Sequence, residues 1–151
     1  MPELPEVETV VRTLRPQVLD CCIERVDVFR ERSLHPLSLP VERLAGTRIS
    51  AVRRRGKLAL LELEPPAAAA AVPVPSLLAV HLRMTGRFMV HPEGAAPLKH
   101  TRIIFHLRRP DGSRAQLFFD DVRSFGLVFT ATPELLDRWD FWCSLGPEPL
   151  E

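Results

Sequence analysis

The sequence is poor in cysteine, carries no excess of charge of either sign and lacks a long apolar run. Its three cysteines are the adjacent Cys21 and Cys22 and the distant Cys143. No CxxC or CxH spacing is present, so the cysteines indicate reduced thiols and no metal site in this chain. Lysine and arginine total 20 against 19 for aspartate and glutamate, a net charge of +1 that neither requires nor excludes a polyanionic partner.

The apolar residues are distributed as in one soluble domain. A chain of 151 residues, 46% of them hydrophobic, suffices for a single domain with its own core. The longest apolar stretch, residues 67–74, is too short to span a bilayer and contains Pro73. The first twenty residues lack the basic start and apolar segment of a signal peptide. We therefore expect a cytoplasmic monomer with no membrane partner.

The periodicity of apolar residues predicts one helix followed by strands. Apolar residues recur at helical spacing from Val7 to Val18; Pro5 suits the first turn, and Pro16 should end or bend the helix. Turn signals such as Thr85-Gly86 separate the later segments, and no crossover helix lies between them, which favours antiparallel pairing. The expected strands are residues 23–29, 47–52, 58–63, 77–82, 88–90, 102–107, 115–119 and 127–130.

The predicted fold class is mainly β with flanking α: a two-layer antiparallel β-sandwich of about eight strands, with an N-terminal and a C-terminal helix. The C-terminal helix should begin at Pro133, and its apolar positions recur as far as Trp142. Residues 64–75 are rich in alanine and proline and predict a long, poorly ordered hairpin loop. Residues 145–151 are rich in proline, which is typical of a linker between domains.

The first residues contain a candidate nucleophile. Removal of Met1 would expose the secondary amine of Pro2, with Glu3 and Glu6 within one helical turn. An α-amino group titrates near pH 8, so part of it is neutral and nucleophilic at pH 7. Attack on the anomeric carbon of a sugar would displace a base and leave an iminium, while the carboxylates move protons. Proline and glutamate also suit any helix start, and on the chemistry alone this second interpretation carries more weight.

Residues 2–9, PELPEVET, resemble the N-terminal signature of the formamidopyrimidine-DNA glycosylase family. The resemblance implies a base-excision repair enzyme that acts on damaged double-stranded DNA as both a glycosylase and an abasic-site lyase. Its expected substrates are oxidised purines such as 8-oxoguanine and formamidopyrimidines. The enzyme would remove these bases and then cleave the strand by β,δ-elimination through a Schiff base on Pro2. Glu3 and Glu6 would be its acid-base groups.

Two further segments match the family in the same order along the chain. Residues 54–57, RRGK, resemble its basic turn, which implies that Lys57 approaches the DNA phosphate and the damaged nucleotide. Residues 81–86, HLRMTG, are similar to its HLGMTG-type segment, which implies that Met84 fills the space left by an extruded base. Arg83 replaces the usual glycine. Taken alone, the first segment would indicate a solvated basic turn and Met84 could equally be a core residue.

Residues 121–126, DVRSFG, resemble the family's DPRRFG segment, which implies that Arg123 pairs with the orphaned base and that Phe125 wedges beside it. Ser124 stands where a second arginine contacts phosphate, so we expect weaker DNA binding for all sequences. Val122 also departs from the pattern. Residues 99–102, KHTR, match the family's KHDH-like segment in part, which makes His100 either a phosphate contact or an ordinary surface histidine.

The resemblance also predicts the domain organisation. Residues 1–145 would be the catalytic domain and residues 146–151 the start of a linker, so the chain is interpreted as a fragment that is weak or inactive by itself. The family's helix-two-turns-helix and zinc-finger domains would follow; zinc is expected there, and no cofactor or metal site is expected in this chain. The alternatives are an endonuclease VIII-like glycosylase for oxidised pyrimidines and a non-catalytic DNA-binding module.

Overall fold

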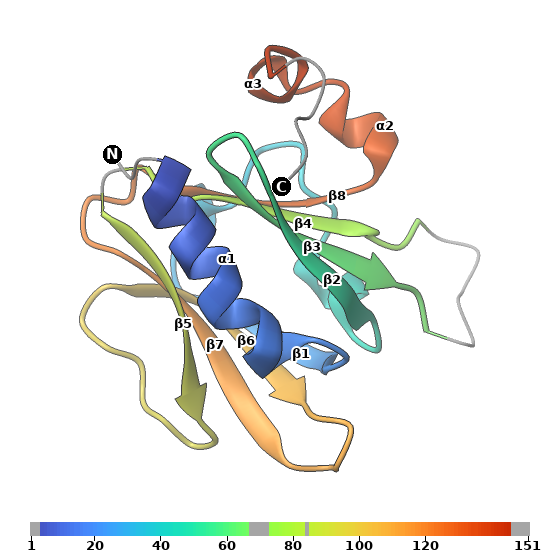
Figure 1. The fold of residues 1–151 in the computed structure, drawn as a ribbon, viewed down its shortest axis with the longest axis vertical. Coiled ribbons are helices and arrows are strands. Elements are labelled where there is room, and N and C mark those ends of the chain that lie inside the picture. The colour runs from blue at the N-terminus through green and yellow to red at the C-terminus, as the bar shows by residue number, and fades with distance from the viewer. Residues whose placement is uncertain (1–3, 67–72, 84, 146–151) are drawn as a thin grey trace.

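The computed structural model describes residues 4–66, 73–83 and 85–145. Within these residues, eight antiparallel strands form one hydrogen-bonded sheet in the order β5-β7-β6-β1-β2-β3-β4-β8 (Figure 1). The strands are β1 Cys22–Val28, β2 Arg48–Arg55, β3 Leu58–Glu64, β4 Leu77–His81, β5 Gly86–Pro92, β6 Thr101–Arg108, β7 Arg114–Asp121 and β8 Leu127–Ala131. The mainly β, antiparallel fold predicted from the sequence is thus confirmed, and every predicted strand overlaps an observed one.

The two halves of the sheet are joined loosely and enclose a common core. In the described residues, β1 and β2 share one register pair, Cys22 with Arg48, whereas β1 pairs with β6 along most of its length. Bulges interrupt β1, β2 and β6, and bulges bend strands. Phe105 and Phe119 from one half and Leu61 and Val80 from the other belong to the same buried cluster. The sheet therefore has the two packed layers expected of a sandwich.

Helix α1, Leu4–Val18, packs against this core and contacts β2, β3 and β5 (Figure 1). Its buried stripe includes Val11, Leu14 and Val18, which follow the predicted helical spacing. Pro16 lies inside the helix and does not end it immediately. Proline removes one backbone donor, but only two residues follow it, and the burial of Val18 retains that last half-turn.

The C-terminal region forms two short helices, α2 Pro133–Leu136 and α3 Asp140–Cys143, where the sequence predicted one. The hydroxyl of Thr132 accepts a hydrogen bond from the Leu135 amide and caps α2. The helix breaks because Trp139 adopts an extended backbone and buries its ring 5.6 Å from that of Phe129. In the part of the chain that is described, no helix is both long and apolar enough to cross a membrane.

The second layer of packing covers the other face of β3, β4 and β8. Ala59 and Leu61 of β3 point into the main cluster, whereas Leu58 and Leu60 join a second cluster with residues of α2 and its flanks. The short 3-10 helices η1, Glu31–Ser33, and η2, Val41–Leu44, were not predicted, because three or four residues are too few for a periodic pattern. The predicted loop between β3 and β4 joins an antiparallel pair, but residues 67–72 lie outside the described residues.

The position of the core predicts that replacing two different phenylalanines by alanine has very different effects on the free energy of unfolding. Phe105 is fully buried in the main cluster, and Phe29 is 52% exposed. Phe105→Ala should lower the free energy of unfolding by about 3–5 kcal/mol, whereas Phe29→Ala should change it by about 0.5 kcal/mol or less. Urea denaturation of both variants measures this, and equal losses would contradict the placement of the core.

Candidate nucleic-acid interface

The structure describes five of the eight predicted site residues. Glu6, Lys57, His100, Arg123 and Phe125 lie in described segments. The predictions for Pro2, Glu3 and Met84 fall outside them and stay predictions.

Glu6 lies at a pocket formed by the first turns of α1 and by the chain that enters β5. The pocket has a volume of about 250 Å³. Its lining residues are Glu6, Val10, Leu82, Thr85, Gly86, Arg87, Phe88 and Met89. The Gly86 amide donates to the carbonyl of Leu82 at 2.8 Å, and a Cβ on Gly86 would lie 2.5 Å from that oxygen. This position therefore requires glycine, and the tight turn keeps residues 85–89 opposite Glu6.

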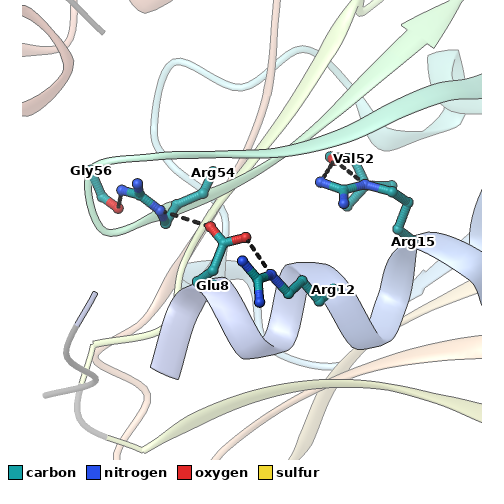
Figure 2. A network of polar contacts seen from close by, with 6 residues as sticks. All are labelled: Glu8, Arg12, Arg15, Val52, Arg54 and Gly56. Carbon is teal, nitrogen blue, oxygen red and sulfur yellow. Dashed lines mark hydrogen bonds and ion pairs between the residues drawn. The ribbon is translucent and has the colours of Figure 1, made fainter. Parts of the chain in front are cut away.

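Glu8 connects α1 to the turn between β2 and β3 (Figure 2). Its Oε1 accepts from Arg54 Nε at 3.1 Å and its Oε2 from Arg12 Nε at 3.0 Å. Arg54 Nη1 also donates to the carbonyl of Gly56 at 3.0 Å. Burial raises the pKa of Glu8, but the hydrogen bonds and positive charges of Arg54 and Arg12 outweigh it and leave this pKa below its ordinary value. A carboxylate of the helix thus holds the turn that precedes Lys57.

The same turn is packed from its other side. The guanidinium of Arg55 lies 4.0 Å from the ring centroid of Trp142, and a Cβ on Gly56 would lie 2.9 Å from a methyl group of Leu145. Lys57 itself is half-buried. The two arginines before Lys57, the residue predicted to approach the DNA, therefore make contacts inside the protein. Sequence spacing gave no signal for these contacts, which join residues far apart in the chain.

The loop between β7 and β8 exposes its predicted wedge. Phe125 is 50% exposed and its neighbour Val122 is 56% exposed. The amide of Arg123 donates to the hydroxyl of Thr85 at 3.3 Å, which brings this loop to the one that precedes β5. Exposed apolar side chains of this size, on a loop fixed by hydrogen bonds, are suited to insertion between bases.

His81 is a buried histidine that the sequence analysis did not single out. It ends β4, is 1% exposed, and its ring centroid lies 4.9 Å from that of Phe141. Its Nδ1 accepts from the Arg83 amide at 3.2 Å. Burial, with smaller effects from the charges of Arg83 and Lys57, lowers its pKa to about 4. The imidazole is therefore neutral at pH 7.

His100 is half-buried at the entry to β6. Its carbonyl accepts from the amide of Asp121 at 3.0 Å, so its backbone is attached to the same region as Thr85 and Arg123. Its role as a phosphate contact stays a prediction. Among the described residues, no group of three or more His, Cys, Asp or Glu side chains could hold a metal ion.

Comparison with known proteins decides the family. A sequence model of the formamidopyrimidine-DNA glycosylase N-terminal domain matches residues 1–128. The chain belongs to this family. It is 38% identical over 153 residues to the formamidopyrimidine-DNA glycosylase of Carboxydothermus hydrogenoformans, covering 100% of this chain and 49% of that protein. The corresponding protein of Moorella thermoacetica is 40% identical over 159 residues, with 51% of its length covered.

Solved structures of this glycosylase family have the same fold. A complex of Lactococcus lactis Fpg with abasic-site DNA matches with a TM-score of 0.77 and 27% identity, covering 99% of this chain and 51% of that one. A complex of the same enzyme with DNA containing an oxidised pyrimidine matches with a TM-score of 0.73 and 27% identity, covering 93% and 48%. The chain spans about half the length of the curated relatives it matches.

Two residues that depart from the glycosylase pattern, Arg83 and Ser124, have a positive φ. Arg83 replaces the glycine of the HLGMTG-type segment and has a φ of 55°, in the left-handed region that favours glycine. Ser124 replaces an arginine, has a φ of 57° and is 8% exposed. Both loops of the predicted interface therefore contain a non-glycine residue in a strained backbone conformation, as loops at functional sites do.

The contact between Glu8 and Arg54 predicts unequal effects of two neutralising variants. Glu8→Gln removes the charge opposite Arg54, whose side chain is 14% exposed, and should lower the free energy of unfolding by about 1 kcal/mol. Arg12→Gln is the matched control: Arg12 is 74% exposed, so the loss should stay below about 0.5 kcal/mol.

Urea denaturation at pH 7 compares these two variants. Because the folded pKa of Glu8 is lowered, its contribution is present above its ordinary pKa of 4.5 and is lost as the pH falls through the lower folded value. The difference between wild type and Glu8→Gln should therefore shrink below pH 4.5. A loss for Arg12→Gln as large as that for Glu8→Gln would contradict this account.

The buried imidazole predicts a loss of stability in mild acid. The unfolded chain protonates His81 near pH 6.5 and the folded chain only near pH 4, so the unfolded state binds more protons between these values. The free energy of unfolding should therefore fall as the pH falls across this window, by up to about 3 kcal/mol from this residue. His81→Gln should flatten the decline, and an NMR titration of the wild-type imidazole should have its midpoint near pH 4. A midpoint near pH 6.5 would refute the assignment.

Proposed function

We propose that this chain forms the catalytic part of a base-excision DNA glycosylase with abasic-site lyase activity. The observation that supports this most directly is the pocket at the start of α1, where Glu6 faces residues 85–89. The loop with Arg123 and Phe125 is hydrogen-bonded to Thr85, which lines this pocket. The turn that precedes Lys57 is hydrogen-bonded to α1 through Arg54 and Glu8. A deoxyribose placed at this pocket would have the carboxylate of Glu6 beside it. Arg123 and Phe125 would lie near the same DNA strand.

The proposed chemistry begins at the amine of Pro2 once Met1 is removed. While Met1 is attached, the nitrogen of Pro2 is a tertiary amide without a lone pair to donate. The free amine attacks C1′ of the damaged nucleotide, the glycosidic bond breaks, and the base leaves with a proton supplied by an acidic group. The amine gives up its own proton, and the C1′–O4′ bond of the sugar opens with a proton delivered to O4′, which leaves an iminium between Pro2 and C1′. This iminium acidifies the proton on C2′; its removal expels the 3′ phosphate, and a second elimination expels the 5′ phosphate. Glu3 and Glu6 are the proposed proton carriers.

The remaining residues bind DNA in this proposal. Lys57 and His100 contact phosphate, and their positive or hydrogen-bonding groups supply affinity that does not depend on sequence. Met84, Arg123 and Phe125 fill the stack after the damaged base is extruded, which offsets an unstacking cost of a few kcal/mol. The exposure of Phe125 and the attachment of Arg123 to Thr85 support these roles.

Oxidised purines are the proposed substrates, and oxidised pyrimidines are the second candidate. The solved complex of Lactococcus lactis Fpg with an oxidised-pyrimidine DNA shows such a lesion bound to a protein of this family. The substrate test therefore includes both lesion classes in otherwise identical duplexes, together with an undamaged duplex.

Borohydride trapping tests the proposal with the full natural polypeptide, its N-terminus checked by mass spectrometry. The processed enzyme should form a covalent adduct with 8-oxoguanine DNA, and peptide mapping should locate it at Pro2. An uncleaved N-terminal tag makes the Pro2 nitrogen an amide and should abolish the adduct. Glu6→Gln should slow adduct formation at least about 100-fold, whereas Glu31→Gln, exposed on η1, should not.

The outcomes separate the alternatives. An adduct formed by the tagged protein would overturn the assignment of the nucleophile. Tight binding to lesion DNA without an adduct from the processed enzyme would favour the non-catalytic DNA-binding module. Faster trapping on oxidised pyrimidines than on oxidised purines would favour the endonuclease VIII-like alternative.

A further inference from the structure

Asp121 is a buried carboxylate that the proposed chemistry does not use. It ends β7, is 0% exposed, and pairs in register with Gly86 of β5. A buried carboxylate is costly unless hydrogen bonds compensate for the water it has lost. The hydrogen-bond donors around Asp121 therefore indicate the structural role of this residue.

One carboxylate oxygen holds the chain that precedes β5. The hydroxyl of Thr85 donates to Asp121 Oδ1 at 2.6 Å, the short distance of a charge-assisted bond. The same hydroxyl oxygen accepts from the amide of Arg123 at 3.3 Å. Thr85 thus connects Asp121 to the loop between β7 and β8 through a single oxygen atom.

The other oxygen holds the far end of that loop. The buried amide of Gly126 donates to Asp121 Oδ2 at 2.6 Å. A Cβ on Gly126 would lie 2.8 Å from the carbonyl of His81 and 3.0 Å from Oδ2, so no larger residue fits without a shift of the backbone. The loop that carries Arg123 and Phe125 is therefore attached directly to one oxygen of Asp121 at Gly126 and, through Thr85, to the other oxygen at Arg123.

The backbone of Asp121 adds a third segment. Its amide donates to the carbonyl of His100, and its carbonyl accepts from Arg102 Nε at 3.0 Å and from the Ser124 amide at 3.3 Å. The start of β6, the entry to β5 and the loop after β7 therefore meet at this residue. These are the segments that contain or adjoin the predicted DNA contacts His100, Met84, Arg123 and Phe125.

We propose that Asp121 is a positioning residue that couples the loop before β5 to the loop after β7, so that the side chains that enter the DNA stack move as one unit. The coupling through Thr85 and Gly126 is a property of the protein without DNA. Its benefit for DNA binding rests on the proposed function: loops ordered in advance lose less entropy when they enter the duplex.

The chain offers a matched pair of threonine–aspartate contacts for the test. Thr101 donates to Asp120 Oδ1 at 2.6 Å, with the same chemistry and distance one residue earlier on β7, and this contact does not involve residues 123–126. Thr85→Val keeps the shape of the side chain and removes the hydroxyl, Thr85→Ser restores it, and Thr101→Val is the control. Asp121→Asn keeps the shape of Asp121 and leaves one of its two donors without an acceptor.

Amide hydrogen exchange, followed by NMR without DNA, measures the coupling. Thr85→Val should speed exchange at Arg123 about tenfold. If Asp121 transmits the change, exchange at Gly126, whose own bond is untouched, should also increase. Thr85→Ser should restore both rates, and Asp121→Asn should increase both. Thr101→Val should leave both unchanged, and the β1–β6 ladder around Val26 should be unaffected in every variant. The proposal would be overturned if exchange at Arg123 and at Gly126 were as slow in Thr85→Val as in wild type. Faster exchange throughout the fold would also overturn it.

A second measurement tests the benefit for DNA binding. In the full natural polypeptide, Thr85→Val should weaken binding to a duplex with an abasic-site analogue about tenfold, and Thr85→Ser should restore it. Unchanged affinity in Thr85→Val would overturn the role in DNA binding. Failure of wild type to trap lesion DNA, together with the expected exchange pattern, would instead refute the proposed function and leave the coupling intact.

Discussion

The burial of the apolar stripe of α1 is the interaction on which the rest of the arrangement depends. The two halves of the sheet share one register pair in the described residues, so their association relies on the common core and on the helix that packs against it. Val11, Leu14 and Val18 insert into that core, and Arg15 donates two hydrogen bonds to the carbonyl of Val52 (Figure 2). The orientation of the helix places Glu6 at the pocket and Glu8 beside the turn of Arg54.

Glu8 and Asp121 make similar polar contacts around the predicted interface. Loops and turns next to the predicted DNA contacts are attached to buried or half-buried acidic groups: Glu8 holds the turn before Lys57, and Asp121 holds the loops next to Met84 and Phe125. Each carboxylate uses both oxygens, so it specifies the relative position of two partners. Such contacts add modest stability compared with the core, but they restrict the loops from which a DNA-binding surface is built.

Much of the fold followed from local patterns in the sequence. The strands are short and apolar and lie between turn residues, so their positions were predictable to within a few residues. Tertiary packing opposed the local signal at the C-terminal helix, which is divided because Trp139 packs on Phe129. Packing also retains the two residues of α1 that follow Pro16, because Val18 is buried. The short pairing between β1 and β2, a single register pair in the described residues, had no local signal.

The sequence by itself determined which residue types occur in which order, and therefore the family, the period-two strands and the identity of the candidate site residues. Tertiary structure alone decided which of them meet. Glu8 and Arg54 are 46 residues apart and Thr85 and Asp121 are 36 apart, so their contacts depend on strand register and helix orientation. The neutrality of His81 was decided in the same way, because it is burial by distant residues such as Phe141 that removes water from the ring.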